Sequence, residues 1–241
     1  FDIRYLDKNG ELQHCWTTSW GLSTRFVGAI IMVHGDDQGL ILPPRLAPQQ
    51  AVIVPIYKTD QERSAVMLAA RKLRSELVSS DFRVILDERE GVSPGYKFND
   101  WEMRGVPLRI EIGPKDIAKE TVVLARRDVP GRDGKSFVPQ AGLPDAVRQT
   151  LHSIQGALYE RALKFRQDHT EDPADYAAFR QAVEKGFAHS FWCGSAECER
   201  RIKEDTRATL RCIPLEQTGE KGRCICCGGE AAEKAYFARA Y

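Results

Sequence analysis

The sequence predicts a multidomain chain of α/β and α+β class, and three observations support this prediction. Apolar strand patterns alternate with an amphipathic helix pattern between residues 51 and 127, which is typical of an α/β domain. A proline-rich stretch at 39–48 interrupts both periodicities and indicates a domain boundary. Five of the seven cysteines lie within 193–227 at short spacings, which favours a small metal-stabilised domain over a disulfide framework. The expected domains are residues 1–48, 49–143 and 144–241.

The composition is that of a soluble globular protein, with 42% hydrophobic and 29% charged residues among 241. The formal net charge is +1, so the basic excess of many nucleic-acid binders is absent and any RNA contact must rest on local patches. The sequence contains neither an apolar run long enough to cross a membrane nor a signal peptide. We therefore expect a cytoplasmic protein without membrane contact. Because the chain starts with Phe1 and not with Met, we expect a fragment of a longer protein.

The first expected domain begins with a hairpin over residues 2–18, whose turn contains an Asn-Gly pair that tolerates positive φ. Within residues 15–36 we expect a strand that leads into a helix, because apolar residues there recur at helical spacing. Ser23 and Thr24 can cap this helix, which places Arg25 in a first turn whose free N–H groups favour an anion. The alternative is an ordinary buried amphipathic helix with Arg25 pointing to solvent.

The second expected domain has strands at 51–57, 82–87, 106–113 and 121–127 and a helix at 60–78. This order predicts a mostly parallel sheet that leaves residues 88–105 at the carboxyl ends of strands, where ligand sites usually form. In the segment 97–116, basic and acidic side chains are interleaved beside aromatic residues. Such a pattern suits single-stranded RNA, because carboxylates accept hydrogen bonds from guanine edges while Arg and Lys bind phosphates or guanine O6 and N7. The alternative is a solvated charged face.

The third expected domain starts with connector helices at 144–168 and 174–185. Two cysteine pairs follow: Cys193 with Cys198, and Cys224 with Cys227. A tetrahedral Zn²⁺ takes four thiolates from two such knuckles and then has no open position, so the expected zinc site is structural. Cys226 competes with Cys227, but the first and fourth positions of a two-residue knuckle face the same metal. A small buried hydrophobe is the alternative for each cysteine, and it fits two of them better, Cys15 and Cys212.

The stretch SWGLSTR at 19–25, followed by VGAIIMVHGDDQGLILPP at 27–44, resembles motif 3 of the class II aminoacyl-tRNA synthetases. It is similar to the version found in prolyl-tRNA synthetases of the archaeal and eukaryotic-like type, except that Thr17 stands where that family commonly has Gln. The resemblance implies that the first domain is the end of a class II antiparallel-sheet catalytic domain. It also implies that Arg25 is the catalytic residue that binds the ATP phosphates and that Ser23 contributes to the nucleotide site.

The segment KFNDWEMRGVPLRIEIGPKD at 97–116 resembles the signature of the anticodon-binding domain of the same family. The resemblance implies that the second domain reads two anticodon guanines of tRNA(Pro). The implied readers are Glu102, Arg109, Lys115, Asp116 and, in the loop at 128–135, Lys135.

The third domain resembles the C-terminal domain of these synthetases in WCGSAECE at 192–199, TLRCIP at 209–214, CICCG at 224–228 and FARAY at 237–241. The family's zinc ligands fall on the four cysteines already selected. In the family the terminal carboxylate folds back toward the aminoacylation site, a role that the resemblance implies for Tyr241. The alternative for this end of the chain is a final edge strand packed on the zinc domain.

Taken over essentially all 241 residues, the resemblance implies the C-terminal part of a prolyl-tRNA synthetase. The implied reaction uses ATP and Mg²⁺ to activate L-proline as prolyl-adenylate and then transfers proline to tRNA(Pro), in an enzyme that is generally a homodimer. Because the family's motifs 1 and 2 would lie upstream, we expect that this chain alone cannot form the adenylate. The competing interpretations are a non-catalytic tRNA-binding accessory module and a zinc-stabilised interaction domain without RNA.

Overall fold

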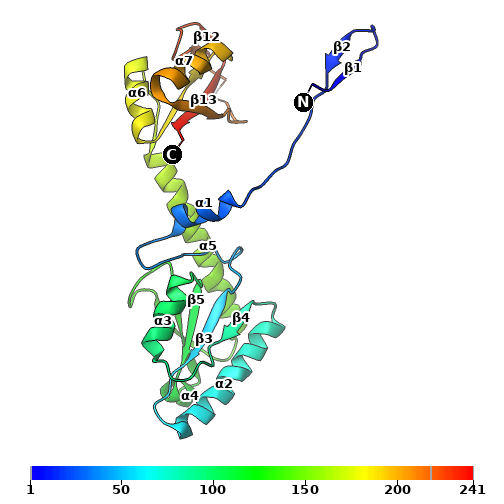
Figure 1. Ribbon diagram of the computed structural model, residues 1–241. Helices are drawn as coiled ribbons and strands as arrows, with labels where there is room; N and C mark the ends of the chain where they lie inside the picture. Colours follow the sequence, from blue (N-terminus) through cyan, green and yellow to red (C-terminus); the bar gives the residue numbers. More distant parts are fainter. Residues whose placement is uncertain (1, 218, 241) are drawn as a thin grey trace. The chain divides into compact units, whose positions relative to one another are not determined.

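A computed structural model describes residues 2–217 and 219–240, and it divides the chain into two compact units (Figure 1). The first unit is Phe1–Gln155 and the second is Gly156–Tyr241. The fold is mixed α/β with several sheets, in agreement with the expected class. No helix among the described residues is long and apolar enough to cross a membrane.

The predicted N-terminal hairpin is confirmed. Strands β1 (Arg4–Leu6) and β2 (Leu12–His14) pair antiparallel. The Asp7 carboxylate fixes the turn, because it accepts hydrogen bonds from the N–H groups of Asn9 (2.8 Å) and Glu11 (3.0 Å). Gly10 adopts a φ of +80°, which a side chain would make unfavourable.

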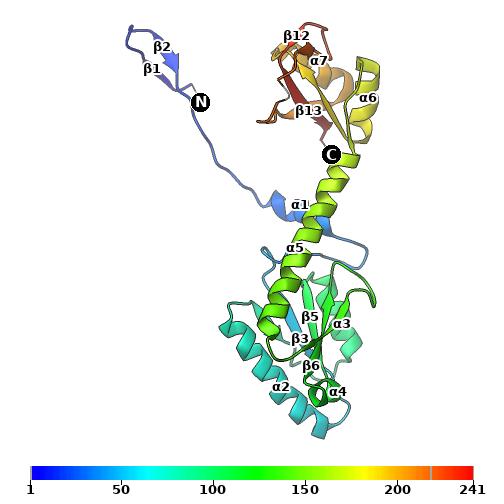
Figure 2. The ribbon, with the colours of Figure 1, turned by 180° about the vertical axis from the view of Figure 1, so that it is seen from behind.

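Helix α1 (Arg25–His34) is where a helix was predicted, but the strand expected to lead into it is wrong. The chain between β2 and α1 forms no regular element (Figure 2). None of the α1 side chains is buried, so the alternative of a buried amphipathic helix is also wrong. The helix therefore carries the apolar residues that the spacing predicts, but the described residues of the first unit do not bury them.

The centre of the first unit is a five-stranded sheet with the order β4-β3-β5-β6-β7. Its strands are β3 (Ala51–Pro55), β4 (Val84–Leu86), β5 (Leu108–Ile112), β6 (Thr121–Arg126) and β7 (Lys135–Pro139). Strand β3 pairs parallel with β4 and β5, whereas β5 with β6 and β6 with β7 pair antiparallel. The prediction of a mostly parallel sheet is therefore wrong. Helix α4 (Pro114–Ala118) is too short for the crossover that a parallel β6 would need.

Helices α2 (Asp60–Ser79) and α3 (Pro94–Met103) both pack against β3, and Figures 1 and 2 show the sheet between them. Every residue of β3 is buried, as expected of a strand covered on both faces. The Trp101 side chain of α3 packs against Val52 and Val54. Helix α2 begins with a capping box, in which the Thr59 side chain accepts a hydrogen bond from the Glu62 N–H and the Glu62 carboxylate accepts one from the Thr59 N–H.

The proline-rich stretch at 39–48, predicted as a domain boundary, packs against the first unit. Ile41 and Ala47 are buried, and the Arg83 guanidinium donates hydrogen bonds to the carbonyl oxygens of Ala47 and Pro44 at 3.0 Å each. These contacts hold a segment without regular structure against the first unit.

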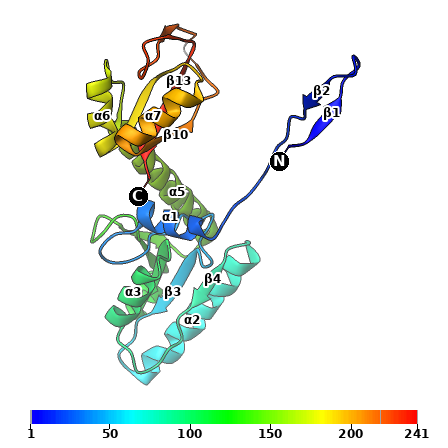
Figure 3. The same cartoon turned by 45° about the horizontal axis from the view of Figure 1, so that its top comes forward.

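The second unit contains a four-stranded sheet with the order β10-β13-β9-β8. Its strands are β8 (Thr170–Glu171), β9 (Phe187–Trp192), β10 (Ala208–Cys212) and β13 (Glu233–Arg239), and a small separate ribbon pairs β11 (Gly222–Arg223) with β12 (Glu230–Ala231). Helices α6 (Tyr176–Lys185) and α7 (Ala196–Thr206) lie beside this sheet (Figure 3). Helix α5 (Leu143–Asp168) runs through the division between the units. The two predicted helices, α5 and α6, are present, but α6 packs against β9 and β13 in the core of the second unit and is not only a connector.

Strand β13 occupies an inner position between β10 and β9, so the alternative of a final edge strand is wrong. Phe179 of α6 and Phe237 of β13 meet edge to face, with ring centroids 5.4 Å apart, at the centre of this unit's core. Tyr241 lies outside the described residues.

Candidate functional site

Three of the predicted guanine readers meet on one face of the central sheet. Arg109 of β5 is only 11% exposed, and its guanidinium lies 2.5 Å from a carboxylate oxygen of Glu102 and 3.0 Å from Glu111. Lys135, at the start of β7, places its Nζ at 2.9 and 3.0 Å from the two carboxylate oxygens of Glu111. The Phe98 ring lies beneath both cations, 4.0 Å from the Arg109 guanidinium and 5.7 Å from Lys135 Nζ. We call these five residues the β5 cluster.

Glu111 was missed as a site residue by the sequence analysis, although it is the buried centre of the β5 cluster. It lies two residues after Arg109 on the same strand, so both side chains project from the same face. This i, i+2 relation was the available signal. Lys97 and Glu111 are buried and paired, so the alternative of a solvated charged face is wrong for them.

The other two predicted readers lie outside the β5 cluster, on helix α4 after the end of β5. The Asp116 carboxylate accepts a hydrogen bond from the Gly113 N–H at 2.8 Å and so caps this helix. Lys115 is exposed, and its ammonium has no partner within residues 2–217 and 219–240. The structure thus brings three of the five predicted readers together in the β5 cluster and places the other two, Lys115 and Asp116, on α4.

A buried arginine that the sequence analysis did not select lies directly behind Glu102. The Arg127 side chain is only 4% exposed and donates to both oxygens of Asp36, at 2.6 and 2.9 Å. Its Nε donates to the backbone carbonyl of Glu102 at 3.0 Å. The hydrogen bonds from Arg127 hold the pKa of Asp36 below its ordinary value, against the opposing effect of burial. Arg127 therefore joins the segment after α1 to the end of α3.

The turn Asp36–Gly39 is pressed against the end of α3. The Leu40 N–H donates to the Met103 carbonyl at 3.0 Å. Gly39 has a φ of +127°, and a Cβ added there would lie 2.5 Å from Met103 Cα. Only glycine fits this approach, which accounts for the second glycine of the HGDDQGL sequence, Gly39.

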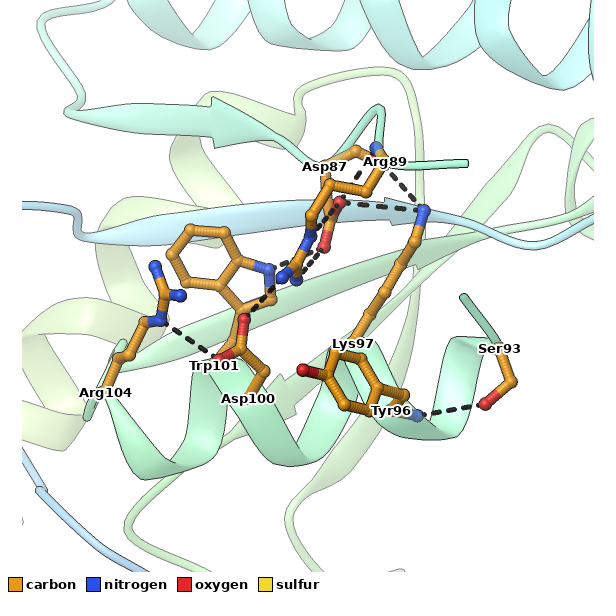
Figure 4. A network of polar contacts seen from close by, with 8 residues as sticks. All are labelled: Asp87, Arg89, Ser93, Tyr96, Lys97, Asp100, Trp101 and Arg104. Atoms are coloured by element: carbon orange, nitrogen blue, oxygen red, sulfur yellow. Dashed lines mark hydrogen bonds and ion pairs between the residues drawn. The ribbon is translucent and has the colours of Figure 1, made fainter. Parts of the chain in front are cut away.

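A second polar network fixes α3 onto the sheet (Figure 4). The buried Asp87 carboxylate accepts hydrogen bonds from the Arg89 guanidinium at 2.7 Å and from Trp101 Nε1 at 2.8 Å. Lys97 is 3% exposed and donates to the Asp87 carbonyl at 3.1 Å. Burial opposes ionisation of Asp87, but the hydrogen bonds from Arg89 and Trp101 lower its pKa to about 2. Asp100 completes the network by binding Arg89 at 2.7 Å.

The predicted nucleotide residues lie at the start of α1. Arg25 is the first residue of the helix, and its backbone N–H is 3.4 Å from Ser23 Oγ. Thr24 occupies the N-cap position, but its side chain makes no capping hydrogen bond. Ser23 and Arg25 are both exposed, and in the described part of the chain the Arg25 guanidinium has no hydrogen bond or ion pair.

The four predicted zinc ligands come together in the second unit. The sulfur atoms of Cys193, Cys198, Cys224 and Cys227 all lie within 4.8 Å of one another. The Sγ–Sγ distance is 3.7 Å between Cys193 and Cys198 and 3.9 Å between Cys193 and Cys227. Four sulfurs at 2.3 Å from a tetrahedral Zn²⁺ would lie about 3.8 Å apart, so the residues fit this metal.

The electrostatics of the four thiols explains what a cation would supply. Burial opposes ionisation of Cys224, yet the backbone N–H groups of Cys227, Cys226 and Cys193 lower its pKa to about 7. Burial, together with the neighbouring Cys227 and Cys193, raises the pKa of Cys198. Cys224 therefore forms a thiolate readily, whereas ionisation of a second thiol, Cys198, is unfavourable. A divalent cation at the centre removes this opposition.

The remaining cysteines differ in their surroundings. Cys226 is half-buried, packs against the core of the second unit and is not among the four clustered sulfurs. Cys15 is also half-buried. Cys212 is exposed, so its interpretation as a small buried hydrophobe is wrong. It follows Arg211 at the end of β10, where the strand register against β13 shifts.

Two families match parts of this chain. Residues 50–150 match the family described as "Anticodon binding domain", and residues 176–241 match the family described as "Prolyl-tRNA synthetase, C-terminal". The first range contains the central sheet and the whole β5 cluster, and the second contains the four clustered cysteines.

Several curated relatives match the whole chain. A protein named "Proline--tRNA ligase" from Chloroflexus aurantiacus is 56% identical over 241 residues, which are 100% of this chain and 50% of the relative. The same identity and coverage hold for a "Proline--tRNA ligase" from Roseiflexus sp.. A "Proline--tRNA ligase, chloroplastic/mitochondrial" from Arabidopsis thaliana is 48% identical over 245 residues, which are 45% of that protein. The chain thus spans about half the length of the curated relatives it matches.

Proposed function

We propose that this chain is part of a proline–tRNA ligase, which activates L-proline with ATP and Mg²⁺ and transfers it to tRNA(Pro). The observation that carries the proposal is the position of the β5 cluster within a region that matches an anticodon-binding family. Similarity over the full chain to ligases of this name supports the same activity. The sequence motifs further favour the archaeal and eukaryotic-like type, and we assign the enzyme to the cytoplasm as a homodimer.

The proposed domains follow the sequence motifs. Residues 1–48 form the end of the catalytic domain, 49–143 form the anticodon-binding domain, and 144–241 form the connector helices and the zinc domain. The end of the first domain is packed on the second through Arg127 and Asp36, both within the first unit.

The β5 cluster can read one guanine with the groups that remain accessible. The Glu102 side chain is 31% exposed, and the oxygen not held by Arg109 can accept hydrogen bonds from guanine N1–H and N2–H. Lys135, 35% exposed, can donate to guanine O6 or N7. Arg109 is nearly buried between two carboxylates, so it positions Glu102 rather than reaching the base itself. Lys115 and Asp116 are then the proposed readers of the second guanine.

At the nucleotide site, we assign phosphate binding to Arg25 and a contact with the nucleotide to Ser23. Both are exposed at the N-terminus of α1, where unpaired N–H groups add to the attraction of phosphate. Mg²⁺ would share the phosphate charge with Arg25 in the full enzyme. For Tyr241 we propose that the terminal carboxylate approaches the aminoacylation site.

We assign Zn²⁺ to the four clustered cysteines as a structural ion. Four thiolates fill its coordination shell, so no position remains for a reactive water. Its binding contributes on the order of 10 kcal/mol to the folding of a small zinc domain.

The test is the affinity of this chain for tRNA(Pro) transcripts with both anticodon guanines intact or replaced one at a time, at fixed salt. Each replaced guanine should weaken binding by about tenfold or more, because a good bidentate base contact is worth about 1–3 kcal/mol. Equal affinity for all transcripts would refute anticodon reading by this chain.

A further inference from the structure

A hollow of about 410 Å³ lies between the outer face of α3 and the turn Asp36–Gly39, and the proposed function uses only one of its walls. Its lining residues are Gln38, Tyr96, Asn99, Asp100, Glu102 and Met103. Glu102 belongs to this hollow and to the β5 cluster, so the two sites are contiguous.

The polar groups at this hollow are largely unused by the fold. Within the described ranges, the side-chain amides of Gln38 and Asn99 and the hydroxyl of Tyr96 make no hydrogen bond. Tyr96 is 57% exposed, and the Arg89 guanidinium lies over its ring at 6.0 Å from the centroid. Asp100 differs, because Arg89 and Arg104 bind its two oxygens at 2.7 and 3.2 Å. The hollow thus offers two amides, a phenol and one free oxygen of Glu102.

This set of groups selects a neutral, flat ligand. Two carboxylates line the hollow and no cationic side chain does, which disfavours a phosphate or another anion inside it. Asp100 is already neutralised by arginines, so a metal ion would gain little there. An exposed aromatic ring beside amides that can both donate and accept hydrogen bonds suits a nucleobase, which stacks by its face and pairs by its edge.

Both walls are held rigidly, as a reading site requires. The Gln38 N–H donates to Asp36 Oδ1 at 2.9 Å, and the turn is closed by two backbone hydrogen bonds of 3.0 Å between Asp36 and Gly39. Arg127 binds the same Asp36 carboxylate. Helix α3 is held to the sheet through Trp101 and Asp87.

We propose that this hollow binds a third unpaired base of the tRNA anticodon loop, which neighbours the guanine that Glu102 reads and differs from the second guanine assigned to Lys115 and Asp116. Tyr96 stacks on this base, and Asn99 and Gln38 determine which base is preferred. Arg104, which is 56% exposed and pairs with Asp100 of the lining, contacts the adjoining phosphate. The proposal rests on the proposed function, since it needs an anticodon loop at the β5 cluster.

The test uses this chain and a fluorescent anticodon stem-loop of tRNA(Pro) with both guanines intact. Tyr96→Ala should weaken binding by about tenfold, because stacking of a base on an aromatic ring is worth about 1–3 kcal/mol. Tyr159→Ala is the matched control, since Tyr159 is a 62% exposed tyrosine on α5 that does not line this hollow, and it should bind like the unchanged chain. Tyr96→Phe should retain most of the affinity.

A series of stem-loops with one abasic nucleotide at each loop position identifies the bound base. At one position next to a guanine, base removal should weaken binding to the unchanged chain but add nothing to the effect of Tyr96→Ala. If Tyr96→Ala binds as tightly as Tyr159→Ala while replaced guanines still weaken binding, the hollow binds no base and the proposed function stands. If guanine replacement has no effect in any variant, the proposed function fails and this inference fails with it.

Discussion

The β5 cluster and the four-cysteine cluster differ in whether their polar side chains have partners of opposite charge within the fold. In the β5 cluster, Arg109 and Lys135 face the carboxylates of Glu102 and Glu111, so the fold itself supplies each charge with its partner. In the cysteine cluster, four groups of the same kind converge and the chain offers no cationic partner among the clustered atoms. The first site is therefore formed before its ligand binds, whereas the proposed zinc ion would complete the second.

The largest effect expected from this difference is that of metal removal. A strong zinc chelator should unfold the second unit, because structural zinc contributes on the order of 10 kcal/mol in small zinc domains, and should leave the first unit folded. Hydrogen exchange with mass spectrometry reads both units in one sample. Loss of protection in β9 and β13 with unchanged protection in β3 is the expected result.

Two variants control that experiment. Cys224→Ser should reproduce the effect of the chelator, and Cys212→Ser should not, since Cys212 is exposed outside the cluster. Equal protection of the second unit with and without metal would contradict the account.

The next effect concerns the buried arginine behind Glu102. Asp36→Ala should lower the free energy of unfolding of the first unit by about 3 kcal/mol, because it leaves the nearly buried Arg127 without its counter-charge. Asp37→Ala is the matched control one residue away, and it should change the free energy by less than about 0.5 kcal/mol. Urea unfolding measures the free energy of unfolding of both variants. Equal free energies for the two would show that the Asp36–Arg127 pair does not stabilise the first unit.

A smaller effect is a dependence of the first unit on acid pH. The pKa of Asp87 is about 2 in the folded chain, below its ordinary value of 3.8. The ionised carboxylate therefore stabilises the fold above about pH 4, and this contribution of about 2 kcal/mol is lost as the pH falls from about 4 to about 2.

The NMR signal of the Trp101 indole N–H, which donates to Asp87, reports this loss directly when followed through urea unfolding at each pH. Asp87→Asn should reduce the stability at neutral pH and flatten its change between pH 4 and 2. An unchanged slope in that variant would assign the acid sensitivity to other groups.

What could be predicted from the sequence was mainly local. The hairpin turn, helix α2 and the four clustered cysteines depend on spacings within short segments, and the structure has each of them where it was expected. The strand β7 was missed because its residues are mostly exposed and carry no alternating apolar pattern. The prediction of a mostly parallel sheet was wrong because the short helix α4 between β5 and β6 allows only antiparallel pairing, and the strand pattern does not reveal the length of this helix.

The burial of charged side chains was the part of the site that the sequence could not give. Glu111, Asp87 and Arg127 look like surface residues in the sequence, since charged residues are rarely buried unless paired. Glu111 and Asp87 each have one partner two residues away, in Arg109 and Arg89. The partners Lys135, Trp101 and Asp36 lie 24, 14 and 91 residues away from Glu111, Asp87 and Arg127. Only the folded chain brings such distant pairs together. The positioning of Glu102 by Arg109 and Arg127 could therefore be seen in the structure but not predicted from the sequence.

The measurement that tests the central claim most directly is a double-mutant cycle between Glu102 and one anticodon guanine. Glu102→Gln and replacement of each guanine by inosine, which lacks the N2 amino group, are combined, and affinity for the tRNA(Pro) stem-loop is measured at fixed salt. The account predicts that each change weakens binding about tenfold or more and that, at one anticodon position, the second change then adds almost nothing. Independent, additive effects at both positions would contradict the claim that Glu102 reads an anticodon guanine.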